Sequence, residues 1–519
     1  MDDLDATRCY RAILSRDRRF DGRFFVGVRT TGIYCRPICP ARTPKQENIQ
    51  FFPCAAAAEA AGFRPCLRCR PESSPGTPAW LGSSAVVSRA LKLIGEGALD
   101  DGDVDALAGR LGIGARQLRR LFGTHLGASP LAVAIARRVH FARRLLDETE
   151  LPVAQVALAA GFTSIRQFNH ALRSTFARSP RELRRGRSAR RPTQAEGALT
   201  VRLPYRPPLE WDAMLAFLAP RATPGVECVA DGAYRRTIEV GGAAGVVEVR
   251  AAAREPHLDL TIWLPAYDGL RQIVERARRT FDLGADPLQI ARQLRRSAAL
   301  APRLEALPGI RVAGAWDPFE LAVRAILGQQ VTVKGATTLA GRLVERFGRP
   351  LVTGMTGLTH LFPRAETLAD ADLAPIGLPV ARARTIRTLA RSIAHGELTL
   401  DASLGLEDFV TRLCAIPGLG PWTAHYIAMR ALGEPDAFPA SDLGLRRAVA
   451  ASDRPASSAD LATLAETWRP WRSYAAFLLW APPEPAVAPR ARARAARPAP
   501  ARRPLAPGAR EPGRLRAAR

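Results

Sequence analysis

Residues 413–424 read Leu-Cys-Ala-Ile-Pro-Gly-Leu-Gly-Pro-Trp-Thr-Ala, and this stretch decides how the carboxyl-terminal part of the chain folds. The apolar residues before Pro417 predict one helix, and Pro421 predicts the start of a second, because proline is favoured in a helix's first turn. Gly418 and Gly420 keep the connection narrow, so backbone N–H groups can reach a DNA phosphate. The stretch therefore predicts a hairpin between two helices that binds DNA without reading its sequence.

An acidic residue follows this hairpin just before another helix. Segment 436–442 reads Asp-Ala-Phe-Pro-Ala-Ser-Asp and precedes a helix expected over residues 443–451. Chemistry alone leaves Asp436 and Asp442 as alternatives for a catalytic carboxylate.

Together with two further stretches of sequence, the hairpin and the acidic segment resemble a known family. The two further stretches are residues 319–330 (Phe-Glu-Leu-Ala-Val-Arg-Ala-Ile-Leu-Gly-Gln-Gln) and 468–474 (Trp-Arg-Pro-Trp-Arg-Ser-Tyr). Over about 198–481 the chain resembles the helix-hairpin-helix DNA glycosylase superfamily, in its AlkA-type 3-methyladenine branch. The resemblance implies that Asp442 is the catalytic carboxylate. It also implies aromatic walls of a base pocket, which would otherwise be interpreted as hydrophobic core: Trp422, Tyr426 and Trp480. The DNA contacts that it implies are Gln330, Gly418, Gly420 and Thr423.

The chain departs from neighbouring patterns at two positions. Superfamily members that also cleave the DNA strand carry a lysine where this chain has Trp422, so we expect hydrolysis alone. An alkylated purine is cationic and leaves as a neutral base, so one carboxylate suffices where ordinary glycosidases use two. Gln330 stands where an AlkA-type relative has an apolar residue that wedges into the duplex. This predicts weaker wedging, or a wedge supplied by a neighbouring residue.

Four of the eight cysteines lie in two closely spaced pairs near the amino terminus. The pairs form a C-x3-C and a C-x2-C motif, with a 26-residue insert between them: Cys35 with Cys39, and Cys66 with Cys69. Four thiolates close a tetrahedral zinc site, so the spacing predicts one structural Zn²⁺. The alternative is four small buried residues. We interpret the other cysteines, Cys9, Cys54, Cys228 and Cys414, as ordinary core or surface residues.

The surroundings of these cysteines resemble the amino-terminal domain of the Ada adaptive-response protein over residues 1 to about 75. The segments concerned are 28–37 (Val-Arg-Thr-Thr-Gly-Ile-Tyr-Cys-Arg-Pro) and 60–69 (Ala-Ala-Gly-Phe-Arg-Pro-Cys-Leu-Arg-Cys). The resemblance implies that Cys35 accepts a methyl group from a DNA methylphosphotriester. It places Thr31, Arg42 and Arg64 near DNA. Methylation would change the formal charge of the zinc-thiolate centre from minus two to minus one, which would favour DNA binding and act as a switch. A purely structural zinc module is the alternative.

Two helix–turn–helix patterns follow. Residues 104–122 predict an apolar helix, a turn at Gly112 and a basic helix, and residues 153–170 repeat the pattern around Gly161. Joined by a helix around 133–146 and ending in Ser-Pro-Arg-Glu-Leu-Arg at 179–184, the two units resemble the AraC-family DNA-binding domain over about 85–185. The groove-facing polar residues would be Arg116, Gln117, Arg119, Arg166 and Gln167. His140 and His170 suit core or phosphate-adjacent positions better than catalysis.

Composition agrees with a nucleic-acid partner. The 519 residues carry 75 Lys and Arg against 49 Asp and Glu, a formal net charge of +26. Biased genome composition is the alternative explanation. No signal peptide and no membrane span are evident, so we expect a cytoplasmic, nucleoid-associated monomer without membrane contact. Double-stranded and alkylated DNA are the expected partners, with RNA polymerase contacted through the regulator part.

The predicted fold class is multidomain and mainly α, with α+β parts. We expect a zinc-bound α/β domain (1–78), a double helix-turn-helix domain (85–185), a linker (186–197), a β-rich lobe (198–285), a helix-hairpin-helix domain (286–481) and a disordered basic tail (482–519). The leading hypothesis is a repair enzyme and alkylation sensor. The rival is a transcription regulator whose glycosylase region is only a DNA clamp. O6-alkylguanine transfer is not expected, because a Pro-Cys-His-Arg motif is absent.

Overall fold

The computed structural model describes residues 5–76, 85–100, 102–185, 197–267, 269–450 and 452–481. The described residues form one compact unit. The expected linker, apart from Gly197, and the expected basic tail lie outside the described residues.

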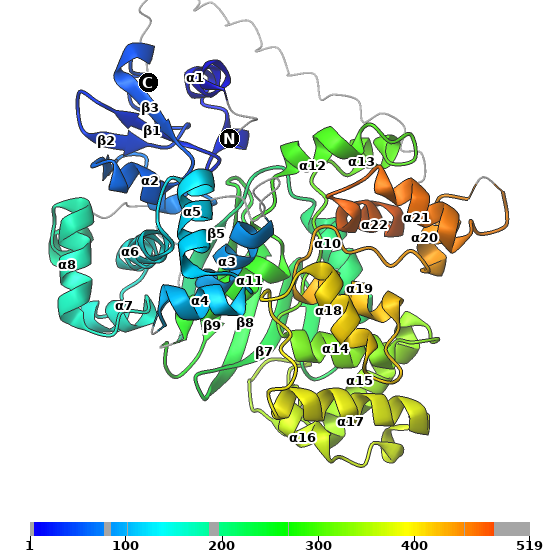
Figure 1. Cartoon of the computed structure of the whole chain (residues 1–519). Helices are drawn as coiled ribbons and strands as arrows, with labels where there is room; N and C mark the ends of the chain where they lie inside the picture. Colours follow the sequence, from blue (N-terminus) through cyan, green and yellow to red (C-terminus); the bar gives the residue numbers. More distant parts are fainter. Residues whose placement is uncertain are drawn as a thin grey trace, which may run out of the picture. The chain divides into compact units, whose positions relative to one another are not determined.

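The amino-terminal part is a small sheet with short helices, in agreement with the zinc-bound α/β domain expected there. Strands β1 (Phe25–Val28), β2 (Ile33–Cys35), β3 (Ile49–Phe52) and β4 (Arg64–Pro65) have the order β3-β1-β2-β4. Only β2 and β4 pair in parallel, with Ile33 opposite Arg64, and this pairing brings the two cysteine-bearing segments together. Helices α1 (Ala6–Ser15) and α2 (Ala55–Ala60) accompany the sheet (Figure 1).

Residues 85–185 are helical, in agreement with their apolar periodicity. Glycines end the first helix of each helix-turn-helix unit, and Gly112 (φ 72°) and Gly161 (φ 83°) adopt the left-handed conformation that these turns require. The helices are α3 (Ala85–Gly95), α4 (Val104–Arg110), α5 (Ala115–Leu126), α6 (Pro130–Glu148), α7 (Val153–Ala159), α8 (Ile165–Phe176) and α9 (Pro180–Arg185).

The period-two alternation after residue 198 corresponds to one five-stranded antiparallel sheet. Its order is β5-β9-β8-β7-β6, and Leu258, Leu260 and Ile262 of β9 alternate into the core. The strands are β5 (Leu199–Pro204), β6 (Glu227–Ala230), β7 (Ala233–Val240), β8 (Ala243–Ala251) and β9 (His257–Trp263). Helix α10 (Trp211–Leu218) lies in the connection from β5 to β6.

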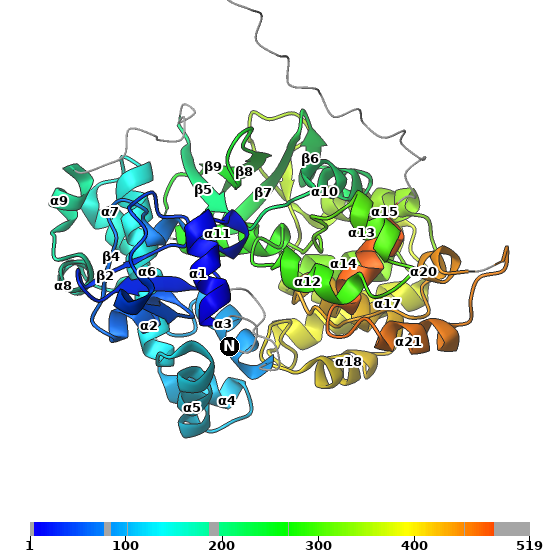
Figure 2. The same cartoon turned by 90° about the horizontal axis from the view of Figure 1, so that it is seen from above.

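Helices dominate from residue 270 onward and lie beside this sheet in both views (Figures 1 and 2). They are α11 (Leu270–Thr280), α12 (Pro287–Leu294), α13 (Ala301–Ala306), α14 (Pro318–Leu327), α15 (Val333–Phe347), α16 (Ala365–Ala369), α17 (Val380–Ala394), α18 (Leu406–Cys414), α19 (Pro421–Ala431), α20 (Leu443–Ala448), α21 (Ser458–Glu466) and α22 (Arg472–Trp480).

Two details differ from the sequence predictions. The short strands β10 (Arg349–Pro350) and β11 (His360–Leu361) interrupt the helical region, because residues 359 and 360 donate to the Gly225 carbonyl near the larger sheet. Helix α20 ends at Ala448 rather than Ala451. The Arg446 carbonyl accepts from the Ala456 N–H and the Arg446 side chain donates to the Ala456 carbonyl, so the returning chain replaces the next helical bond.

The hydrophobic cores do not follow the expected domain borders. One core joins the α6–α9 region to the five-stranded sheet and the carboxyl-terminal helices, whereas a second joins the zinc-domain sheet to α3–α5. The first of these cores also has a hydrogen bond across it at the end of α6. There the Arg202 N–H of β5 donates to the Glu148 carboxylate at 3.1 Å. Within the described residues, no helix is long and apolar enough to cross a membrane.

Candidate functional site

The four paired cysteines come together at one end of the small sheet. All four sulfur atoms of Cys35, Cys39, Cys66 and Cys69 lie within 4.8 Å of one another. A tetrahedral zinc–thiolate centre with Zn–S bonds of about 2.3 Å places its sulfurs roughly 3.8 Å apart. The donor set and its spacing therefore fit one Zn²⁺.

The four sulfurs lie close enough to shift one another's pKa values. Hydrogen bonding with Cys35 is the largest cause of a lowered pKa at Cys66 and of a raised pKa at Cys69. The Arg36 N–H donates to the Cys69 sulfur at 3.4 Å. Cys69 is buried, while Cys35 and Cys39 are half-buried, so Cys35 keeps an approach from solvent.

The polar residues expected at DNA around this cluster are exposed: Thr31, Arg42 and Arg64. The Arg64 N–H donates to the Gly32 carbonyl at 2.8 Å, so Arg64 and Thr31 lie on neighbouring segments.

The two basic helices of the helix-turn-helix units, α5 and α8, also present the expected side chains to solvent. Their apolar faces are buried through Leu118 and Phe168. The five exposed polar residues are Arg116, Gln117 and Arg119 of α5, and Arg166 and Gln167 of α8.

The hairpin between α18 and α19 has the geometry that its glycines predicted. Gly418 has φ 92°, and a Cβ there would lie 2.1 Å from the Thr385 hydroxyl oxygen. Thr385 fixes the turn by donating to the Pro417 carbonyl at 2.8 Å. Among the described residues, no acceptor is found for the N–H groups of Gly418 and Gly420, so both remain free to bind an anion.

Thr423 contributes to the hairpin differently from the sequence interpretation. Its side chain is buried and accepts from the Gln329 amide at 3.0 Å, so it holds the hairpin against the α14–α15 turn. Gln329 also donates to the Gly418 carbonyl at 3.0 Å and ties the α14–α15 turn to the hairpin. Gln330, at the tip of that turn, is exposed with φ 57°, and Val331 beside it is 40% exposed.

Asp442 lies at the centre of the expected aromatic pocket. Its two carboxylate oxygens accept from the indole N–H groups of Trp422 and Trp480, both at 3.0 Å. Asp442 is also the N-cap of α20, where it accepts from the Leu445 N–H at 2.9 Å. The structure thus brings together three of the residues expected from sequence in one hydrogen-bonded group.

Asp436 has another role. Arg472 donates to it at 2.8 Å and Arg469 forms a second ion pair with it. These structural ion pairs occupy its carboxylate, whereas the carboxylate of Asp442 accepts from two indole N–H groups.

The aromatic wall is larger than the sequence indicated. Tyr426 stacks on Trp422 with ring centroids 5.4 Å apart and meets Trp480 edge-on at 6.2 Å. From Trp480 the ring contacts continue to Phe477 at 5.4 Å and from there to Phe217 at 4.8 Å. Sequence reasoning missed Phe217 and Phe477. Phe477 lies three residues before Trp480 on α22, a spacing that could have indicated it, whereas Phe217 comes from α10 in a distant segment.

Four families match successive parts of the chain: the "Metal binding domain of Ada" at residues 8–72, a "Helix-turn-helix domain" at 107–186, the "AlkA N-terminal domain" at 200–317 and the "HhH-GPD superfamily base excision DNA repair protein" at 323–473. Together they define a DNA-binding repair protein with a zinc-binding domain and a base-excision glycosylase fold.

Relatives cover both the whole chain and its parts. A probable bifunctional transcriptional activator/DNA repair enzyme AlkA of Mycobacterium tuberculosis is 47% identical over 478 residues, 92% of this chain and 96% of its own. DNA-3-methyladenine glycosylase 2 of Escherichia coli is 34% identical over 54% of this chain and 95% of its own. The Escherichia coli bifunctional transcriptional activator/DNA repair enzyme Ada is 33% identical over 34% of this chain and 48% of its own. This chain belongs to the family of bifunctional AlkA transcriptional activator/DNA repair enzymes. It is a DNA glycosylase that binds DNA and carries one structural Zn²⁺ site.

Proposed function

We propose that the chain hydrolyses the N-glycosidic bond of alkylated purines of the 3-methyladenine type, with Asp442 as the catalytic carboxylate. The observation that carries this proposal is the pair of indole N–H groups, from Trp422 and Trp480, that hold Asp442 among the pocket's rings. In this position the carboxylate is oriented by groups that also contact the base, and catalysis needs such preorganised charge.

In the proposed reaction, the bond between the sugar C1′ and the base nitrogen breaks, and its electron pair leaves with the base. The cationic purine becomes neutral, so it needs no proton from a second acid. Asp442 stabilises the positive charge that develops on the sugar, and the oxygen of a water molecule bonds to C1′ while the water releases a proton to solvent. The rings of Tyr426 and Trp480 receive the flipped base, whose positive charge their electron-rich faces favour.

The enzyme should leave the DNA strand intact. Strand cleavage requires an amine that forms a Schiff base with the sugar, and Trp422 cannot form one. Duplex DNA with a labelled strand and methylated bases tests this. The proposal predicts free 3-methyladenine and an unbroken abasic strand. Failure to release base, or an adduct trapped by borohydride, would contradict it.

The hairpin and the α14–α15 turn form the proposed DNA-binding surface of the glycosylase part. The free N–H groups of Gly418 and Gly420 would bind a phosphate, with the backbone of Thr423 beside them. Gln330 would enter the duplex where the flipped base leaves, and the exposed Val331 supplies the apolar surface beside it. Gln329 donates to the Gly418 carbonyl and to the Thr423 hydroxyl, and these two hydrogen bonds fix the position of one loop relative to the other.

Cys35 is the proposed methyl acceptor. Its thiolate sulfur would bond to the methyl carbon of a methylphosphotriester, the carbon–oxygen bond would break, and the phosphodiester would leave with the electron pair. Bound zinc keeps the sulfur deprotonated at neutral pH. Support comes from the approach that half-buried Cys35 offers and buried Cys69 does not. Mass spectrometry after exposure to methylated DNA should find the methyl group on Cys35, and a methyl group on Cys69 would overturn the assignment.

Methylation of Cys35 would lower the negative charge beside Thr31, Arg42 and Arg64, and so strengthen DNA binding. The exposed polar residues of α5 and α8 would then read a promoter, and the regulator part would contact RNA polymerase. We further propose a monomer that associates with the nucleoid through DNA.

The proposed division of the chain stays as the sequence suggested: 1–78, 85–185, 198–285 and 286–481, with connecting and tail segments at 186–197 and 482–519. The four family matches support the order of these domains.

A further inference from the structure

Asp442 is carried by a connection that has no regular secondary structure. Residues 434–442 belong to the link between α19 and α20 and lie outside the helices and strands. Such a segment loses conformational entropy when it is fixed, so contacts from elsewhere must hold it. The carboxylate at its end needs a fixed place, because electrostatic catalysis depends on preorganised charge. The contacts that hold the connection therefore bear on base release.

Helix α22 contacts this connection from both ends of the helix. At its carboxyl-terminal end, the Trp480 indole donates to Asp442 at 3.0 Å. At its amino-terminal end, the Ser473 N–H donates to the Pro435 carbonyl at 2.8 Å, and the buried Ser473 hydroxyl donates to the Glu434 carbonyl at 2.7 Å. A helix rises about 1.5 Å per residue, so these two contacts lie roughly 10 Å apart along it. One rigid element thus holds the connection near its start and at Asp442.

Arg472, the first residue of α22, adds a charged contact near the start of the connection. It is only 8% exposed, and its guanidinium donates to both carboxylate oxygens of Asp436, at 2.8 and 3.1 Å. It also donates to the Asp436 backbone carbonyl at 3.1 Å and to the Glu466 carboxylate at 3.1 Å. A guanidinium group has several donors in a fixed plane, so it can bind the side chain and the main chain of one residue together. Arg472 thereby fixes the path of the main chain at Asp436.

Arg469 pairs with the same aspartate in a different way. Its side chain is 45% exposed, and it contacts the Asp436 carboxylate and Glu466. Of these two arginines, only Arg472 donates to the main chain of residues 434–442 in the described part of the chain. An exposed ion pair contributes little to stability, whereas removing one partner of a buried pair costs more. The two arginines thus form a matched pair for an experiment.

We propose that Arg472 is a positioning residue for base excision: it fixes residues 434–442 through Asp436 and so keeps the Asp442 carboxylate facing the sugar. The inference rests on the proposed catalytic role of Asp442 and deepens it. Arg472 acts through the connection, since its own donors are used by Asp436 and Glu466. A displacement of about 1 Å at a catalytic group can cost up to about a hundredfold in rate, so modest freedom at Asp436 would slow base release.

Single-turnover release of 3-methyladenine, measured beside duplex affinity, tests the proposal. In the full-length protein, we expect Arg472→Gln to slow release about tenfold with duplex affinity unchanged, because a neutral amide cannot replace the bidentate charged contact. Arg469→Gln, which removes the exposed partner of the same aspartate, should stay within about twofold of wild type. An unchanged rate in Arg472→Gln, or equal slowing in the two variants, would overturn the proposal.

A double variant separates positioning from a general loss of structure. If Arg472 acts through Asp442, Arg472→Gln should slow release no further once Asp442→Asn has removed the charge. Independent defects multiply instead. Ser473→Ala removes one hydroxyl from the same end of α22 and should behave alike with a smaller factor, so the test holds even if Arg472→Gln folds poorly. Slowing by the same factor with and without Asp442→Asn would overturn the proposal.

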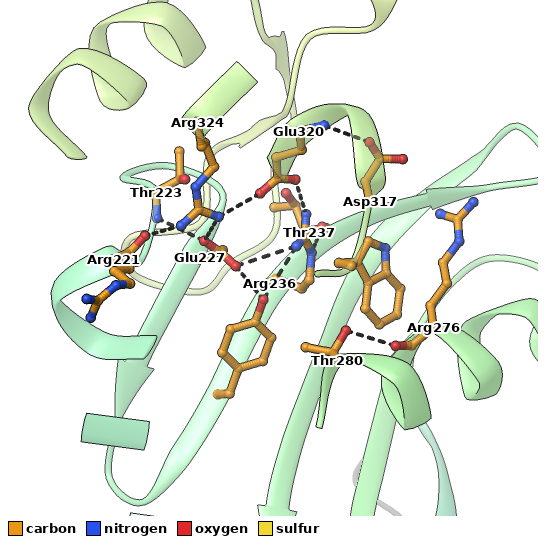
Figure 3. Close-up of polar contacts among 12 residues, drawn as sticks. Arg221, Thr223, Glu227, Arg236, Thr237, Arg276, Thr280, Asp317, Glu320 and Arg324 are labelled. Atoms are coloured by element: carbon orange, nitrogen blue, oxygen red, sulfur yellow. Dashed lines mark hydrogen bonds and ion pairs between the residues drawn. The ribbon is translucent and has the colours of Figure 1, made fainter. Parts of the chain in front are cut away.

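A buried ion pair elsewhere in the glycosylase part controls for lost stability. Glu320 of α14 pairs with Arg236 of β7 at 2.7 Å in a buried cluster, and the side chains labelled in Figure 3 include none from residues 434–442. Glu320→Gln keeps the size of the side chain and removes its charge, so any slowing should multiply with that of Asp442→Asn. If it failed to multiply, the effect would not be specific to Arg472 and the proposal would fall. Full activity in Asp442→Asn would instead contradict the proposed function on which the inference rests.

Discussion

The zinc centre and the base pocket are built in opposite ways. The zinc ligands all lie between residues 35 and 69, on β2, the turn after it and the loop after β4. The pocket gathers Phe217 of α10, Trp422 and Tyr426 of α19, and Trp480 of α22, with Asp442 at the start of α20. One centre depends on a single ion bound by neighbouring segments, whereas the other depends on how distant helices pack. Loss of the zinc centre should therefore affect the zinc domain and the helices α3–α5 that share its core, whereas the base pocket should respond to changes far away in sequence.

Loss of a zinc ligand should produce the largest change. Cys69→Ser removes the buried ligand, and structural zinc contributes on the order of 10–16 kcal/mol of binding free energy that is also folding free energy. We expect less than half an equivalent of zinc and unfolding of residues 5–76 together with α3–α5, which share a core with them, with base release retained. Metal analysis and hydrogen exchange measure this. Cys228→Ser, outside the cluster, is the control, and equal zinc in both variants would contradict the ligand assignment.

The second-largest effect should come from backbone strain introduced into the hairpin. Gly418→Ala combines a left-handed φ of 92° with a Cβ that would lie 2.1 Å from the Thr385 hydroxyl oxygen, so we expect a loss on the order of 1–3 kcal/mol in stability, together with weaker duplex binding. The matched control is Gly420→Ala, where φ is −102° and nothing lies within 4 Å of the added Cβ. Thermal unfolding should separate the two. Equal melting temperatures would show that the hairpin relaxes freely.

The indole hydrogen bonds should have a smaller effect on rate. Trp422→Phe and Trp480→Phe each keep an aromatic wall and remove one donor to Asp442, so each should slow base release roughly tenfold. Trp211→Phe is the control, since its indole donates to the Gly232 carbonyl instead. Single-turnover base release measures the step. An unchanged rate in both pocket variants would mean that the indoles do not orient the carboxylate.

The smallest expected effect is the loss of stability when the hydrogen bond between the zinc domain and α6 is removed. His140 bonds to Glu59 at 2.7 Å, and although burial lowers the pKa of His140, the Glu59 charge outweighs it and raises this pKa above its usual 6.5. The stability from this pair is fully present below about pH 6.5 and is lost as the pH rises through the folded-state pKa.

His140→Gln should therefore destabilise the protein more at about pH 6 than at about pH 9. Urea unfolding at the two pH values measures the difference, with exposed His170→Gln as control. A pH-independent loss would show that His140 contributes packing alone.

The sequence predicted what local spacing determines. The four zinc ligands, the turns at Gly112 and Gly161 and the hairpin at Gly418 each depend on residues close in the chain, and each lies in the expected element. Asp442 stands at the start of its predicted helix for the same reason. Phe217 was missed because only packing of α10 against α22 gives it a role. Thr423 was interpreted as a DNA contact, and its burial against Gln329 depends equally on a distant segment.

Base release by wild type and by Asp442→Asn tests the central claim most directly. The asparagine keeps the shape, and its oxygen can still cap α20 and accept from Trp480, but it lacks the negative charge facing the sugar and its NH2 group replaces the oxygen that accepts from Trp422. Such electrostatic stabilisation commonly contributes on the order of a hundredfold or more in rate. A single-turnover assay that can measure a rate about a hundredfold below that of wild type is therefore sufficient. We predict loss of 3-methyladenine release by about that factor, with duplex affinity and melting temperature nearly unchanged. Full activity in Asp442→Asn would contradict the mechanism.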